Sequence, residues 1–160
     1  KTQASSFLAT KKNATRLQQA RMKYALGAAS LASRDPNKAL DYFAEALVLL
    51  HGSDENLGSA SITRSLDAYL RMPDVAQFLE NSAVSAAVEA RKHNPETVIP
   101  EMQMKTRPLN VKEAAALYRL HELMFPDKKL PAKYDAFAVS YKNPSPGTAA
   151  QAPAEAEKKQ

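Results

Sequence analysis

The sequence predicts an all-α protein. Alanine is abundant among its 160 residues, whereas only four glycines and no tryptophan occur, and no segment alternates apolar and polar residues as a half-buried strand does. Apolar residues instead recur at intervals of three and four, the period of one helical face. A chain of this length can form one domain with a substantial core. We therefore expect about three antiparallel helix pairs, built from six to seven helices.

The first predicted helix pair is joined at Asp35 and Pro36. Proline disfavours a helical conformation in the residue before it and suits the first turn of a helix, so Asp35 is expected to cap the second helix. That helix should end near Gly52, and such a short connection makes the pair antiparallel. The first helix, starting at Asn13, carries the stripe Leu17, Ala20, Tyr24, Ala25, Ala28 and Leu31, and the second carries Ala39, Leu40, Phe43, Ala46, Leu47 and Leu50.

A second pair is expected between residues 62 and 94. Pro73 interrupts its first helix, and Asp74 is expected to cap one continuous helix that ends before Pro95. The first helix presents Ile62, Leu66, Tyr69 and Leu70, and the second presents Val75, Phe78, Leu79, Ala83, Ala86 and Ala90.

The remaining helices follow a loop. Residues 94–109 contain three prolines and predict a loop with one short helix around 99–104. The next helix should begin at Asn110, because Glu113 three residues later resembles a capping box, and should close at Pro126. A last short helix is expected over 133–141.

The chain divides by composition into three regions. We expect a basic N-terminal extension over 1–12, a helical-repeat domain over 13–142 and a Pro/Ala-rich tail over 143–160. The tail lacks the apolar content that would offset its chain entropy, so we expect it to be flexible unless a partner orders it.

Positive charge is concentrated at the start of the chain. Residues 1–34 contain no acidic residue, which together with serine and alanine is typical of a mitochondrial transit peptide and predicts the matrix side of the mitochondrion. A start at Lys1 rather than Met suits a processed or trimmed chain. The basic helix is either a solvated face or a surface that binds an acidic partner. The basic residues are Lys1, Lys11, Lys12, Arg16, Arg21, Lys23 and Arg34, of which Lys11, Lys12, Arg16 and Arg21 are candidate binding residues.

The sequence contains no recognisable catalytic or metal-binding pattern. It has no cysteine, which excludes disulfides and thiolate sites, and its three histidines lie in separate segments. His121 begins a segment that resembles a zinc-binding helix, but Phe125 stands where the second histidine belongs. His121 is therefore expected to be a packed or hydrogen-bonded core residue. We expect a non-enzyme without cofactor, metal or small-molecule substrate, and no apolar run approaches the roughly 18 residues of a membrane span.

The first helix pair carries the most specific pattern in the chain. Leu26 and Gly27 precede Ala39, Phe43 and Ala46 at spacings that resemble the tetratricopeptide signature. Small residues let the two helices approach, and Phe43 is expected to fill the space between neighbouring helices. The match covers about one repeat, and the sequence departs from the family at Lys23, Ser30 and His51. Later pairs repeat it poorly, which fits either degenerate tetratricopeptide or pentatricopeptide-like repeats or an irregular helical bundle.

In size, basic start, degenerate helix pairs and Pro/Ala-rich tail, the chain resembles the eighteen-kilodalton pentatricopeptide-like accessory subunits of trypanosome and euglenid mitochondrial ATP synthases. The resemblance implies a non-catalytic subunit bound to the outer face of the alpha subunits of the F-type catalytic head, in three copies and without RNA. The alternatives are a small pentatricopeptide-like RNA-binding protein and a tetratricopeptide-like adaptor or chaperone that binds peptides. Candidate apolar contacts for a protein partner are Val98, Ile99, Met102 and Met104.

Overall fold

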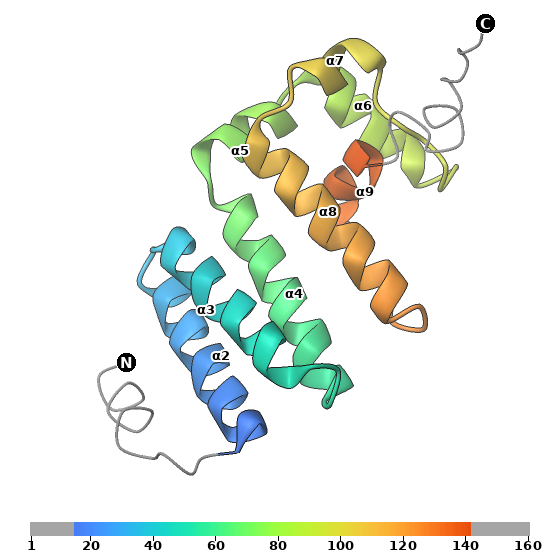
Figure 1. The fold of residues 1–160 in the computed structure, drawn as a ribbon. Coiled ribbons are helices and arrows are strands. Elements are labelled where there is room, and N and C mark those ends of the chain that lie inside the picture. Colours follow the sequence, from blue (N-terminus) through green and yellow to red (C-terminus); the bar gives the residue numbers. More distant parts are fainter. Residues whose placement is uncertain (1–14, 142–160) are drawn as a thin grey trace, which may run out of the picture. The chain divides into compact units, whose positions relative to one another are not determined.

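The structure is a computed structural model that describes residues 15–141 (Figure 1). The expectations for the extension 1–12 and the tail 143–160 fall outside these residues. Within 15–141 the regular structure is helical and no residue forms a strand, so the predicted all-α class is confirmed. None of the helices in this range has the length and apolar character needed to cross a membrane.

The described chain divides into two compact units. The first unit contains residues 15–72 and 121–128, and the second contains residues 73–120 and 129–141. The second predicted helix pair is therefore split between the units. The first unit holds α2 (Arg16–Ala32), α3 (Pro36–Leu50), α4 (Glu55–Leu70) and the last turn of α8 (Leu109–Met124); the second holds α5 (Pro73–Leu79), α6 (Ser82–Arg91), α7 (Glu101–Lys105), the rest of α8, the 3-10 turn η1 (Ala132–Tyr134) and α9 (Asp135–Tyr141).

The turn between α2 and α3 forms as predicted. Asp35 is the N-cap of α3, its Oδ1 accepts the backbone N–H of Lys38 (3.1 Å), and Pro36 occupies the first turn. Arg34 adopts a left-handed conformation, with φ of 62°, which reverses the chain direction. The two helices run antiparallel, and α4 packs against α3 as a third helix of the unit (Figure 1).

The core of the first unit is built around Phe43. This side chain is fully buried and packs with the buried residues Leu31 and Ala39 of α2 and α3 and with Ala68 of α4. The ring of Tyr24 lies 5.5 Å from that of Phe43, tilted by 56°, a favourable aromatic arrangement. Side chains from three helices thus meet around one aromatic ring.

Two arginines cap neighbouring helices of the first unit. Arg16 of α2 donates to the carbonyls of Val48 and Leu49 in the last turn of α3, at 3.2 and 3.3 Å. Arg71 donates to the Leu31 carbonyl in the last turn of α2 at 2.9 Å. Carbonyls at a helix C-terminus lack intrahelical partners and carry partial negative charge, so both cations satisfy acceptors and stabilise the helix ends.

The prediction of one continuous helix from Asp74 to Pro95 was wrong. The segment breaks at Asn81, which lies in an extended conformation between α5 and α6. Its Oδ1 accepts the backbone N–H groups of Ala83 and Val84, at 2.9 and 3.3 Å, and so starts a new helix. As a result Val75 and Phe78 are buried as expected, whereas Ala86 and Ala90 are exposed.

The remaining helices of the second unit lie close to the predicted positions. The short helix α7 and the final η1–α9 segment form as expected. Helix α8 begins at Leu109, one residue before the predicted start, so Asn110 is inside the helix and its side-chain amide donates to Asp74 (2.9 Å). Large buried side chains of this unit include Tyr134, Phe137, Ile99, Val84 and Val111.

Candidate functional site

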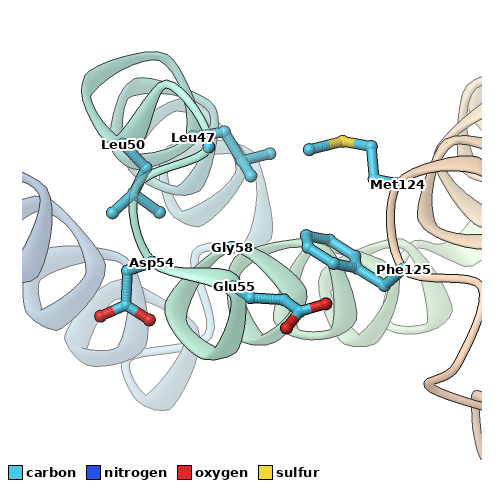
Figure 2. Close-up of a pocket in the computed structure, with 8 residues that line it drawn as sticks. Leu47, Leu50, Asp54, Glu55, Gly58, Met124 and Phe125 are labelled. Atoms are coloured by element: carbon cyan, nitrogen blue, oxygen red, sulfur yellow. The ribbon is translucent and has the colours of Figure 1, made fainter.

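A groove of about 400 Å³ lies in the first unit, where α3 ends and α4 begins. Figure 2 shows Leu47 and Leu50 on one side and Met124 and Phe125 on the other, with Gly58 between them. The volume is in the range of about 300–1,000 Å³ that is usual for binding pockets. Its full lining is Leu47, Leu50, Gly52, Asp54, Glu55, Gly58, Met124 and Phe125.

The floor of the groove depends on the absence of a side chain at Gly58. A Cβ at this position would lie 3.1 Å from Cζ of Phe125 and 4.0 Å from Cδ1 of Leu50. Phe125 is buried and packs into the unit. Met124, the residue before it, is 42% exposed and remains available at the rim of the groove. With a volume of about 400 Å³, the groove has room for side chains rather than for a whole helix, which is about 10–12 Å across.

Carboxylates line one side of the groove. Asp54 is the N-cap of α4, and its Oδ1 accepts the backbone N–H of Leu57 at 2.9 Å. Glu55 follows in the first turn of that helix and is exposed (Figure 2). Beside them, the ammonium of Lys128 donates to the side-chain carbonyl of Asn56 at 3.0 Å. The groove therefore combines an apolar floor with an acidic rim, which suits an apolar side chain accompanied by a cation.

His121 lies within the core of the first unit, next to the lining residue Phe125, which confirms its expected role as a packed or hydrogen-bonded core residue. It is 1% exposed, its Nε2 lies 2.7 Å from Ser59 Oγ, and its ring lies 5.2 Å from that of Phe125. Burial lowers the pKa of His121; Glu122 opposes this shift and Lys128 adds to it. Its Nδ1 has no hydrogen-bond partner among the described residues, so the neutral imidazole is the favoured form.

The residues assigned to repeat packing are all buried in the first unit. Ala39, Phe43 and Ala46 are fully buried, and Leu26 is 2% exposed. Gly27, the only glycine of α2, is buried against the Phe43 ring. Helices α2 and α3 therefore approach each other closely at this residue.

The apolar residues proposed as partner contacts divide into two groups. Ile99 is fully buried and Met104 is 6% exposed, so both side chains belong to the core of the second unit. Val98 and Met102 are 37% and 70% exposed and remain candidate contacts. The sequence did not separate the two groups, because a five-residue helix has too few residues to show which side faces inward.

The four basic residues proposed as binding residues also differ from one another in their surroundings. Lys11 and Lys12 lie outside the described residues, and Arg21 is exposed on α2. Arg16 is committed to the carbonyls of Val48 and Leu49 and has a structural role.

The groove itself was not predicted from the sequence. Phe125 was noted only because it replaces a histidine in a zinc-binding pattern, and Gly58 was given no role. Their pairing across 67 positions is the missed signal: glycine inside a helix is destabilising relative to alanine, and here it leaves the space that the Phe125 ring occupies. Within residues 15–141, no three His, Asp or Glu side chains are grouped so as to hold a metal ion.

Comparison of the chain with protein-family models, with curated proteins and with solved structures gives no match in any of the three. The function must therefore be inferred from the chain's own residues.

Proposed function

We propose that the protein is a non-catalytic helical scaffold that binds another protein, as an accessory subunit of a large mitochondrial assembly. One observation carries the proposal: in the segment 98–104, two apolar side chains are exposed while two others are buried and hold the segment in place. Ile99 and Met104 are buried in the second unit, whereas Val98 and Met102 are exposed. A segment fixed in this way loses little conformational entropy when it binds, and methionine adapts readily to an apolar partner surface.

The packing of α2 and α3 supports a repeat-like scaffold. Gly27 faces the ring of Phe43, and α4 adds a third helix to the same core through Ala68. These are the contacts that a tetratricopeptide or pentatricopeptide-like hairpin uses to pack its helices and to receive the next helix. We propose that this hairpin is the best-formed unit of a degenerate solenoid of about three pairs.

The partner we propose is the alpha subunit of the F-type ATP synthase catalytic head. The basis is the resemblance of the chain to the accessory subunits of that head in size, basic start and degenerate helix pairs. In this role the protein would add surface to the assembly and perform no chemistry of its own.

Native purification tests the proposal. Mitochondria from cells that express the tagged protein are solubilised gently, and the proteins that co-migrate with the tagged protein are identified. We expect the alpha subunit to co-migrate, and Met102→Asp to abolish the association because it places a charge in an apolar contact. Ala90→Asp, at an exposed position of α6, is the matched control and should leave the association intact.

Two results would overturn the proposal. A stable monomer that co-purifies with no protein would remove the scaffold function. A complex that contains RNA instead, with affinity that falls steeply as salt rises, would assign the protein to the RNA-binding class.

A further inference from the structure

We propose that the groove between α3 and α4 is a binding site for the chain's own segment from Phe7 to Lys12. This interaction would bury Phe7 and Leu8 on the apolar floor and place Lys11 and Lys12 beside the acidic rim. The inference stands apart from the partner proposed above, because the groove and the segment belong to one chain.

The attachment point of the segment is the first argument. Residues 1–14 join the described chain at Thr15, the N-cap of α2. The next residue, Arg16, bonds to the carbonyls of Val48 and Leu49, which lie between the lining residues Leu47 and Leu50. The segment thus leaves the first unit at the same end of α3 as the groove.

The length of the segment is sufficient. Eight residue steps separate Thr15 from Phe7, and they span about 26 Å when extended or about 12 Å when helical. Leu50 and Phe125 both approach within 4.0 Å of a Cβ position at Gly58, so apolar side chains pack closely around the floor of the groove. Even the shorter span exceeds the roughly 8–10 Å that separates the axes of packed helices, so the segment is long enough to pass from the start of α2 to the neighbouring end of α3.

The chemistry of the segment matches that of the groove. Phe7 and Lys11 are four residues apart, as are Leu8 and Lys12, so in a helix each apolar residue is followed by a cation on the same side. The groove offers apolar surface from Leu47, Leu50, Met124 and Phe125 beside the carboxylates of Asp54 and Glu55 (Figure 2). Burial of the apolar pair would supply most of the affinity, and the charges would favour one orientation.

The test uses the absence of cysteine and tryptophan from the chain. Met124→Cys is labelled with bimane, whose fluorescence tryptophan quenches on contact, and Phe7→Trp is added. We expect a loss of bimane fluorescence that is independent of protein concentration and absent when residue 7 is Phe. Ser33→Cys, exposed beyond the opposite end of α2, is the matched label position and should keep its fluorescence.

A charge exchange separates specific binding from chance contact. Lys11→Glu with Lys12→Glu should reduce the quenching, and adding Glu55→Lys should restore part of it. A second readout needs no change in the groove: Phe7→Ser with Leu8→Ser should increase hydrogen exchange of the amides around residues 50–59.

Quenching that grows with protein concentration would show that a second copy of the chain fills the groove and would overturn the inference. Unquenched bimane together with unchanged hydrogen exchange would overturn it as well.

Discussion

The ring of Phe43 occupies the space that a side chain on residue 27 would need. A Cβ built on Gly27 would lie 2.6 Å from Cε1 and 2.8 Å from Cδ1 of that ring. Phe43 is fully buried and in contact with three helices, so its ring cannot move aside cheaply.

Gly27→Ala should therefore destabilise the protein. Alanine favours the helical conformation by about 1 kcal/mol over glycine, but overpacking a filled core costs about 1–3 kcal/mol, and contacts below 3 Å place this case at the upper end. We expect a net loss of about 1–2 kcal/mol in the free energy of unfolding, measured by urea denaturation with circular dichroism. In a Phe43→Leu background the same substitution should become nearly neutral. An equal loss in both backgrounds would contradict the steric explanation.

Gly58→Ala should have a smaller effect, although Gly58 is also a buried glycine within a helix. Its Cβ would lie 3.1 Å from Cζ of Phe125, so a shift of a few tenths of an ångström is enough. The gain in helix propensity, about 1 kcal/mol, should offset most of the steric cost. Urea denaturation should give a free energy of unfolding within about 1 kcal/mol of the parent value and clearly higher than that of Gly27→Ala. A larger loss than that of Gly27→Ala would show that Phe125 cannot move.

The stability of the first unit should fall as the pH drops below about 6.5, the ordinary pKa of histidine. Burial lowers the pKa of His121 in the folded state, so between its folded and unfolded pKa the unfolded chain binds more protons. This contribution is complete above the unfolded pKa and is lost as the pH falls toward the folded pKa, with a slope of at most about 1.4 kcal/mol per pH unit. Urea denaturation between pH 5 and pH 8 measures it. His121→Gln should reduce the slope, and an unchanged slope in this variant would exclude His121 as its source.

Asn81→Ala should weaken the start of α6. The side chain accepts two backbone N–H groups of that helix, and loss of such a cap costs about 1 kcal/mol. Thermal unfolding followed by circular dichroism should show a lower midpoint. Asn81→Asp keeps the acceptor oxygen and should retain the parent's stability; equal losses in both variants would mean that the cap is not responsible.

Arg107→Met should destabilise α9. The Arg107 guanidinium donates to the carbonyl of Ser140 near the end of that helix, so its removal leaves a buried acceptor unpaired at a cost of about 1–3 kcal/mol. Hydrogen exchange of the α9 amides should rise. Arg107→Lys keeps the charge but loses the planar group, so its α9 exchange rate should lie between those of the parent and Arg107→Met. Unchanged exchange in Arg107→Met would exclude this role.

Local sequence rules predicted the helices well where a cap or proline marks an end. Asp35-Pro36 defines the α2–α3 turn because both residues act on their immediate neighbours. The break at Asn81 was missed since asparagine inside an apolar stripe reads equally well as an exposed helical residue. The helix break is fixed by the two hydrogen bonds that the Asn81 side chain accepts from the backbone of Ala83 and Val84.

The groove could not be predicted for a different reason. It requires Phe125 to lie against Gly58, and no periodicity within a window of helical length connects residues so far apart. Likewise, the burial of Ile99 and Met104 depends on which side of a short segment faces the core. Partners within about one helical turn can be deduced from sequence, and the more distant ones require the fold.

The contacts of Ser59 and Gly58 with His121 and Phe125 also have a consequence for biosynthesis. Helices α2, α3 and α4 are complete once the ribosome has added Met72, but their missing neighbours are about 50 residues further along the chain. At synthesis rates of about 5–20 residues per second, that interval lasts roughly 2.5–10 s. During this time the face of α4 that bears Gly58 and Ser59 is uncovered on the nascent chain, where a chaperone could recognise it.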